Sequence, residues 1–288
     1  MEILNKSSLM PQNVSLILGF FDGIHLGHKK VIEKAFGDYK TVLITFKKSP
    51  AEFFGKNIEY IYPRNISYNF IQELGVDYIV EYDFSEIANL SADEYLKFLI
   101  ENFNPKVITT GFNHTFGYQK KGNPKLLEEL QEKFSYKYNV VSEFKKEGTT
   151  VCSTEIKYLL QKGDIEKAND FLGHNFRIES LVVEGAKIGR ELGFPTANLE
   201  YPKEIVRIPY GVYSARVFGR NAILNWGIKP TFGTYKEIVE VHIVDYQEDL
   251  YNKNLSVEII KKIRDEKRFN NIEELKKQIK KDIDKCLE

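Results

Sequence analysis

The sequence predicts an α/β domain with a mostly parallel sheet, followed by a small antiparallel β barrel or sandwich that a C-terminal helix closes. Two observations lead to this prediction. Up to Gly173, apolar or β-branched segments alternate with helical segments, which is typical of a parallel sheet covered on both faces. After Gly173, short strand candidates follow one another too closely for helical crossovers, so they should pair antiparallel. We therefore expect two domains, over residues 1–172 and 173–288.

Strand and helix signals of the first half follow in order along the chain. The predicted strands are Val14–Leu18, Thr41–Phe46, Tyr78–Tyr82, Lys106–Thr110 and Asn139–Phe144. The predicted helices cover Lys29–Phe36, Ile66–Leu74, Ser91–Phe103, Asn123–Phe134, Ser153–Gly163 and Asp164–Gly173. Ser91 with Glu94 has the spacing of a capping box, and Asn123 precedes a proline at the first helical position. Ser153 and Asp164 are expected to cap their helices, which the glycines end.

The second half contains five strand candidates and one long helix. The strand candidates are Phe176–Glu184, Tyr213–Phe218, Ala222–Trp226, Ile238–Tyr246 and Leu255–Ile263. The helix begins at about Ile272, and its apolar residues recur at helical spacing, which predicts one apolar face formed by Ile272, Leu275, Ile279, Ile283 and Cys286.

The composition is that of an ordinary globular protein, and it argues against nucleic acid and membrane as partners. Of 288 residues, 42% are hydrophobic and 28% are charged, with 41 basic and 41 acidic side chains. This balance argues against nucleic acid as the main partner, and no apolar run reaches the ~18 residues of a membrane-spanning helix. No secretory signal is visible, and Cys152 and Cys286 are the only cysteines, so we expect free thiols in a reducing cytoplasm.

The stretch from Gly19 to His28 lies between the first predicted strand and the first predicted helix. Gly19 and Gly23 allow a tight turn and a close approach of the backbone to a ligand. His25 and His28 are three residues apart at a helix start, where free N–H groups already favour an anion. We interpret this stretch as a site for nucleotide phosphates. The alternative is two surface histidines after a glycine-rich turn.

A second glycine-rich stretch runs from Gly185 to Leu199, between two strand candidates. Gly185, Gly189 and Gly193 suggest a loop whose amides line phosphates. Thr196 and Asn198 offer oxygen ligands of the kind that Mg²⁺ prefers. The glycine spacing alone favours the alternative, a long glycine-rich surface loop with a tight turn.

Together, the two stretches resemble signatures of the bacterial bifunctional riboflavin kinase/FAD synthetase family. Residues 19–28, Gly-Phe-Phe-Asp-Gly-Ile-His-Leu-Gly-His, are similar to the adenylyltransferase signature, and residues 189–199, Gly-Arg-Glu-Leu-Gly-Phe-Pro-Thr-Ala-Asn-Leu, to the kinase signature. The resemblance implies a Rossmann-like nucleotidyltransferase domain and a kinase barrel. The barrel would phosphorylate riboflavin with ATP and Mg²⁺, and the first domain would transfer AMP from a second ATP to FMN, giving FAD. Small molecules would be the only substrates, and the chain would be a monomer or self-associate weakly.

The resemblance also assigns roles to residues. In the kinase half, Glu240 would be the general base, with Thr196 and Asn198 at the metal, glycines 185, 189 and 193 at phosphate, and Asn225, Arg264 and Phe269 at the flavin. In the adenylyltransferase half, His25 and His28 would bind the triphosphate, together with Gly19, Phe20, Asp22, Gly23, Ser153, Thr154 and Lys157. Asp22 is better suited to ordering the turn than to touching substrate. The residues alone favour reading Glu240 as an ordinary surface glutamate. For Arg264, the alternative is a surface salt bridge with Asp265 or Glu266.

Several positions of the first half depart from the family pattern. Lys157 stands where arginine is usual, Ser49 where a histidine is frequent, and Asn113 where a carboxylate is usual. His114 follows a strand end, so both an approach to the adenylyl site and a plain loop position are open. His242 is expected to pack. Two alternatives therefore stay open: a riboflavin kinase with a degenerate first domain, and a non-catalytic flavin or nucleotide sensor.

Overall fold

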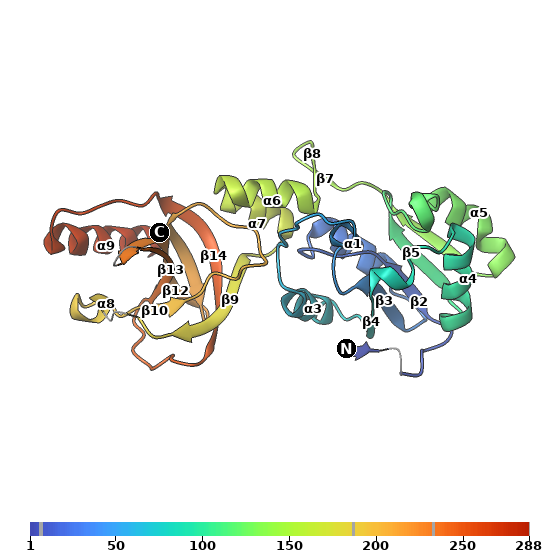
Figure 1. Cartoon of the computed structure of the whole chain (residues 1–288), viewed down its shortest axis with the longest axis horizontal. Helices are drawn as coiled ribbons and strands as arrows, with labels where there is room; N and C mark the ends of the chain where they lie inside the picture. Colours follow the sequence, from blue (N-terminus) through green and yellow to red (C-terminus); the bar gives the residue numbers. More distant parts are fainter. Residues whose placement is uncertain (6–7, 186–187, 232–233, 288) are drawn as a thin grey trace. The chain divides into compact units, whose positions relative to one another are not determined.

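The computed structural model describes residues 1–5, 8–185, 188–231 and 234–287. By contacts, the chain divides into two compact units, Met1–Ser153 and Thr154–Glu288 (Figure 1). The helices between 153 and 172 are thus grouped with the second unit, whereas the predicted domains meet at 172/173. Residues 186 and 187 of the glycine-rich stretch lie outside the described residues.

The first unit contains a sheet of six strands that are all parallel, in the order β1-β4-β3-β2-β5-β6 (Figure 1). The strands are β1 Glu2–Leu4, β2 Ser15–Leu18, β3 Thr41–Phe46, β4 Tyr78–Tyr82, β5 Val107–Gly111 and β6 Lys137–Val141. The chain moves outward from β2 through β3 to β4, then returns to the other side of β2 with β5 and β6. The strand order therefore reverses at β2, and such a switch point is where α/β sheets place ligands.

Helices cover both faces of this sheet, as predicted. Figure 1 shows α1 (Leu26–Ala35) and α3 (Arg64–Glu73) on one side, and α4 (Ala92–Phe103) and α5 (Pro124–Phe134) on the other. Along β2, Leu16 and Leu18 belong to the core that α4 completes, while Ile17 between them is equally buried. Strands buried on both faces have continuous apolar runs, which is why the sequence signal was strong.

Three of the predicted helix caps are confirmed. Ser91 and Glu94 form the capping box of α4, and Asn123 caps α5. Asp164 caps α7 (Ile165–Leu172), which ends at Gly173 in the left-handed conformation. The helix that Ser153 is expected to cap, α6 (Ser153–Lys162), begins at this residue, and the Ser153 hydroxyl donates to the Asp22 carbonyl.

Short elements of the first unit were not predicted. They are β1, the helix α2 (Pro50–Phe53), the 3₁₀ turns η1 (Phe84–Glu86) and η2 (Tyr118–Lys120), and the hairpin of β7 (Lys145–Lys146) and β8 (Thr149–Thr150). Segments of two to four residues carry too little periodicity to be detected. The strand expected over Asn139–Phe144 is shifted toward the N-terminus, to Lys137–Val141.

The second unit is built on a closed barrel, which decides between the predicted barrel and sandwich. Its strands are antiparallel in the order β10-β13-β12-β11-β14-β9. They are β9 Phe176–Val183, β10 Ala197–Leu199, β11 Gly211–Val217, β12 Arg220–Thr231, β13 Thr234–Ile243 and β14 Asn254–Arg264. β10 and the short helix α8 (Ile188–Glu191) were not predicted.

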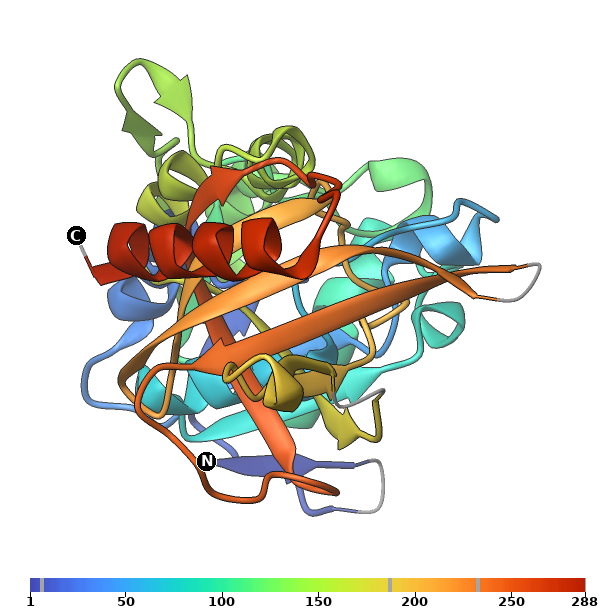
Figure 2. The same ribbon diagram turned by 90° about the vertical axis from the view of Figure 1, so that its left-hand side faces the viewer.

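The terminal helix α9 (Ile272–Leu287) lies across the outside of the barrel strands, as Figure 2 shows. Cys286 and Ile283 pack against Val212 and Ile223 of β11 and β12. The predicted apolar face needs one correction, because Ile272 is 58% exposed. The helix instead buries a charged residue, Asp282, which is only 2% exposed.

Candidate active sites

The loop between β2 and α1 holds an unusual backbone conformation at the switch point of the sheet. Phe21, Gly23 and Ile24 have φ values of 59°, 89° and 44°. Two of these residues are not glycine, and a left-handed conformation costs them roughly 1–2 kcal/mol each. A Cβ on Gly23 would lie 2.6 Å from Ile61 Cδ1, and one on Gly19 would lie 2.8 Å from the Phe21 ring. An added Cβ at either glycine would have to displace a neighbouring side chain, and the positive φ of Gly23 also favours glycine there.

His25 and His28 are brought together at the start of α1. His25 is the N-cap, and its Nδ1 accepts a hydrogen bond from the backbone N–H of His28 at 3.3 Å. The two rings stack with centroids 3.6 Å apart. Since Nδ1 of His25 is an acceptor, a neutral His25 carries its proton on Nε2, which is left as a donor.

Burial keeps both imidazoles neutral at neutral pH. It lowers the pKa of His25 from 6.5 to about 4. Burial, and then the neighbouring His25, hold the pKa of His28 well below its usual value. Within the described residues, the buried Nδ1 of His28 has no hydrogen-bond partner. A buried polar atom without a partner is costly, so a ligand that supplied one would be favoured here.

Asp22 orders the loop, as its predicted role suggested. Its side chain is 6% exposed, and its Oδ1 accepts from the Ile61 N–H at 2.9 Å. Its carbonyl accepts from Ser153 Oγ at 2.8 Å, which brings Ser153 to the loop. Thr154 and Lys157 lie on α6 in the second unit, so their predicted contact with phosphate stays a prediction.

Two features beside the loop were missed by the sequence reasoning. Arg64 at the start of α3 donates to the Phe20 carbonyl at 3.0 Å, and its guanidinium carbon lies 4.5 Å from the centre of the Phe20 ring. A group of aromatic rings also gathers after β3 and β4, with neighbouring centroids 5.3–5.9 Å apart: Phe46, Phe53, Phe54 and Phe84. Phe53 and Phe54 are 52% and 69% exposed. The sequence does not indicate this group, because its four phenylalanines are scattered over 39 positions and form no periodic pattern.

In the second unit, three predicted residues form one row across three strands. Asn198 of β10 is directly opposite Glu240 of β13, which is directly opposite Asn225 of β12. Directly opposed residues share a face of the sheet, with Cβ atoms about 4.5–5.5 Å apart. The neighbours Val239 and Val241 are buried in the barrel, so the row lies on the outer surface.

The predicted glycines leave room for these side chains. A Cβ on Gly185 would lie 2.2 Å from Asn198 Nδ2, and one on Gly189 would lie 2.5 Å from the Phe194 carbonyl and 3.1 Å from Thr196 Oγ1. Gly193 has a φ of 89° and open space around it, so its conformation alone requires glycine. The loop therefore approaches Thr196 and Asn198 closely because it lacks side chains.

A cavity of about 360 Å³ lies between the outer barrel surface and α9. Predicted residues that line it are Gly189, Thr196, Asn225, Glu240, Arg264 and Phe269. Apolar walls come from both sides, with Ile228 and Ile238 on the barrel and Leu275 and Ile279 on the helix. The volume falls within the ~300–1,000 Å³ of small-molecule sites. A smaller cavity of about 80 Å³ shares Thr196 and extends to Tyr246 and Tyr251.

The guanidinium of Arg264 is held by a partner that sequence reasoning did not identify. Its Nε and Nη2 donate to the Asp282 carboxylate at 3.0 and 2.8 Å, and Gln278 also donates to Asp282. Nη1 donates to the backbone carbonyl of Asp265, and the guanidinium carbon lies 5.8 Å from the Phe269 ring centre. Arg264 thus lines the cavity while it joins β14 to α9.

His242 has a role beyond the expected packing. It lies two residues after Glu240 on β13, and its Nδ1 is 2.8 Å from the Pro195 carbonyl. The Phe194 ring meets its imidazole edge-on, with centroids 5.7 Å apart. His242 therefore connects the strand of Glu240 to the segment that carries Thr196.

Comparisons with known proteins agree on the family. A model of the FAD synthetase family matches residues 8–155, and a riboflavin kinase model matches residues 172–288. The bifunctional riboflavin kinase/FMN adenylyltransferase of Bacillus subtilis (strain 168) is 34% identical over 93% of this chain and 89% of its own. The enzyme of the same name from Buchnera aphidicola subsp. Schizaphis graminum is 35% identical over 94% of this chain and 92% of its own.

Among solved structures, a crystal structure described as a macrolide-efflux protein from Streptococcus pneumoniae has a TM-score of 0.88 and 27% identity. It covers 98% of this chain and 97% of its own. Within the described residues, no helix combines the length and apolar character needed to cross a membrane.

These matches define a two-domain transferase of flavin nucleotide synthesis. The chain belongs to the bifunctional riboflavin kinase/FMN adenylyltransferase family.

Proposed function

We propose that this chain converts riboflavin to FMN in residues 173–288 and FMN to FAD in residues 1–172. The observation that carries the proposal is the row of Asn198, Glu240 and Asn225, of which Glu240 and Asn225 line the large cavity. It combines a carboxylate with amide groups beside an apolar space suited to a flat aromatic ligand. The family models support the same division, because they match 8–155 and 172–288.

In the kinase step, the 5′-hydroxyl of riboflavin would attack the γ-phosphorus of ATP. The bond to the leaving ADP oxygen breaks, and Glu240 would accept the hydroxyl proton. The isoalloxazine would lie between Ile228, Leu275 and Ile279 near Phe269, and the nucleotide would extend past Thr196 into the smaller cavity.

Mg²⁺ fits the oxygens that this site offers. Thr196 Oγ1 and Asn198 Oδ1 are hard donors, and the missing side chains of Gly185 and Gly189 leave space beside them. An ion held there together with ATP would neutralise phosphate charge. The amide of Asn198 would serve this purpose only while Gly185 keeps its space open.

In the adenylyl transfer step, a phosphate oxygen of FMN would attack the α-phosphorus of ATP, and pyrophosphate would leave. His25 and His28 would donate hydrogen bonds to phosphate oxygens, and the first turn of α1 would add backbone N–H groups. The exposed rings of Phe53 and Phe54, which pack against Phe84, offer flat apolar surfaces for the flavin. Two free cysteines, Cys152 and Cys286, agree with a reducing cytoplasm as the location.

Product analysis of two variants tests this assignment. Wild-type protein with riboflavin, ATP and Mg²⁺ should form FMN first and then FAD. Glu240→Gln should abolish FMN formation and leave FAD formation from supplied FMN, whereas His28→Ala should do the reverse. Glu128→Gln, an exposed carboxylate on α5, is the control. Accumulation of FMN alone with ample ATP would support the kinase-only alternative, and a joint loss of both activities in either variant would contradict two separate sites.

A further inference from the structure

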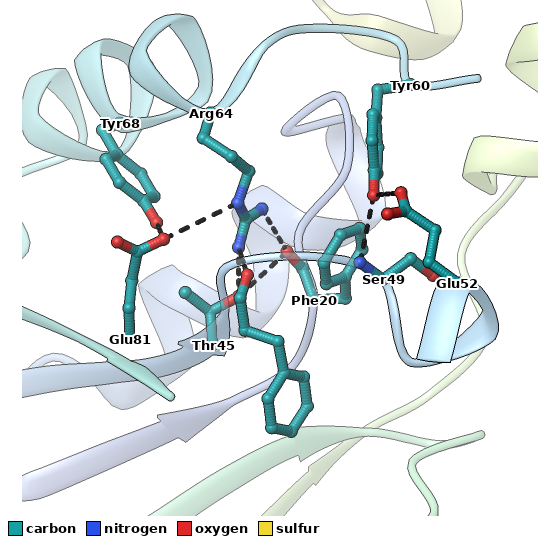
Figure 3. Close-up of polar contacts among 9 residues, drawn as sticks. Phe20, Thr45, Ser49, Glu52, Tyr60, Arg64, Tyr68 and Glu81 are labelled. Carbon is teal, nitrogen blue, oxygen red and sulfur yellow. Dashed lines mark hydrogen bonds and ion pairs between the residues drawn. The ribbon is translucent and has the colours of Figure 1, made fainter. Parts of the chain in front are cut away.

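Arg64 is the only arginine among residues 1–176, and it is placed where β2 and β3 end. Figure 3 shows its guanidinium pointing from the start of α3 toward Phe20 and Thr45. Nη1 donates to the Phe20 carbonyl at 3.0 Å, and Nη2 donates to Thr45 Oγ1 at 2.8 Å and to the Phe46 carbonyl. Thr45 Oγ1 itself donates to the Phe20 carbonyl at 3.1 Å. The guanidinium of Arg64 therefore joins the ends of the adjacent strands β2 and β3.

Two aromatic rings and a carboxylate also surround the guanidinium of Arg64. Its carbon lies 4.5 Å from the Phe20 ring centre and 5.4 Å from that of Tyr68. Nε is 3.9 Å from the Glu81 carboxylate, which accepts a hydrogen bond from Tyr68. The side chain of Arg64 is only 19% exposed. Taking a cation out of water is costly, and the hydrogen bonds to Phe20 and Thr45 and the Glu81 carboxylate compensate for this cost.

The segment that precedes Arg64 makes a second contact with the loop between β2 and α1. Ile61 N–H donates to Asp22 Oδ1 at 2.9 Å, so residues 61–64 contact the loop on both sides of Phe21. Phe21 and Ile24 have positive φ, and such conformations persist only where the surroundings determine them. His25 follows Ile24 directly, so any relaxation of this loop would move the N-cap of α1.

We propose that Arg64 is a positioning residue for adenylyl transfer. It holds the Phe20 carbonyl and ring, and through them the loop that presents His25 and His28, without touching substrate. This inference rests on the proposed function of the first domain. A lysine keeps the charge but cannot donate to Phe20, Thr45 and Phe46 at once, because it lacks the planar fork.

Steady-state kinetics of full-length variants supplied with FMN and ATP test the proposal, with riboflavin phosphorylation as an internal control. Misplacement of reacting groups by about 1 Å costs about 100-fold in rate. We expect Arg64→Ala to lower kcat/KM for adenylyl transfer about 100-fold and Arg64→Lys about 10-fold, mainly through kcat. Kinase activity should stay within about twofold. Lys40→Ala, which removes a surface cation paired with Asp77 at the other end of β3, should leave both activities unchanged.

Two further readouts separate positioning from a purely structural role. If Arg64 only stabilised the fold, the lysine variant would show a lower melting temperature and a wild-type kcat per folded molecule. Thr45→Val, a variant of nearly the same shape, removes one donor to Phe20 and should lower kcat about threefold to tenfold even if Arg64→Ala does not fold. A wild-type kcat/KM in both Arg64→Lys and Thr45→Val would overturn this inference and leave the proposed function of the first domain intact. Wild-type protein that forms no FAD would overturn the proposed function, and this inference with it.

Discussion

Asn198 is packed directly onto Gly185, because a Cβ atom on that glycine would lie 2.2 Å from Asn198 Nδ2. Asn198 also lies directly opposite Glu240 in the barrel. A glycine of the loop therefore determines where an amide of the predicted metal site is placed, relative to the predicted base.

Gly185→Ala is expected to inactivate the kinase step by displacing Asn198. We expect kcat for FMN formation to fall at least ~10-fold, with FAD formation from supplied FMN unchanged. Asn198→Ala should have a similar effect, and the double variant should be little worse than either single one, because both changes act on the same amide. Independent, multiplying effects in steady-state kinetics would contradict this explanation.

Gly23→Ala is expected to affect only the adenylyl transfer step. Gly23 has a φ of 89°, and an added Cβ would lie 2.6 Å from Ile61 Cδ1, next to the amide that holds Asp22. We predict at least a ~10-fold loss of FAD formation from supplied FMN and an unchanged kinase rate. Gly37→Ala is the matched control, because no heavy atom lies within 4 Å of its added Cβ. Equal activity of the two variants would show that the loop tolerates the change.

Asp282→Asn is expected to loosen α9 from the barrel. Asp282 is 2% exposed and binds Arg264 through two carboxylate oxygens. Removing one charge of a buried pair costs about 3–5 kcal/mol, and we expect about 2–3 here because Arg264 keeps 20% of its side chain exposed. Urea unfolding followed by the fluorescence of Trp226, the single tryptophan, measures this loss in the second unit.

Asp284→Asn provides the comparison on the same helix. Asp284 is exposed two residues further along α9, so its substitution should change the free energy of unfolding by no more than about 0.5 kcal/mol. Because Arg264 and Asp282 line the large cavity, the Asp282 variant should also raise the KM for riboflavin. A Trp226 transition that moves equally in both variants would argue against a special role for the buried pair.

The fold was predictable where the signal is local. Ser91 and Glu94 cap a helix with atoms only three residues apart, and the apolar run of β2 follows from burial on both faces. The motifs were informative for the same reason, since His25 and His28 lie within one helical turn. Each of these features is contained within a few consecutive residues.

The contacts that complete both sites are long-range, and no spacing in the chain indicates them. Arg64 reaches Phe20, which is 44 residues away, because β2 and β3 are neighbours in the sheet. Asp282 was hidden by the apolar pattern of α9, in which a charged residue is expected to face water. The row from Asn198 to Asn225 depends on strand register, which loops and turns set over distances that a single sequence does not reveal.

Acidification is expected to destabilise the first unit through its buried histidines. Burial lowers the pKa of His25 from 6.5 to about 4, so the unfolded chain takes up this proton first as the pH falls. The contribution of the neutral His25 to the free energy of unfolding is therefore complete above pH ~6.5, and it is lost progressively as the pH falls to ~4. By pH 5 the loss from His25 should be about 2 kcal/mol relative to pH 7, and His28 shifts in the same direction.

His25→Asn tests this prediction, because asparagine keeps an N-cap acceptor and does not titrate. Urea unfolding of wild type and variant at pH 7, 6 and 5 should be followed by far-UV circular dichroism. The second unit is recorded separately through Trp226 fluorescence. Between pH 7 and 5, the free energy of unfolding of the first unit should fall by about 2 kcal/mol less in the variant than in the wild type. Parallel pH profiles would mean that His25 keeps its ordinary pKa of about 6.5 in the folded protein, which would contradict the effect of burial.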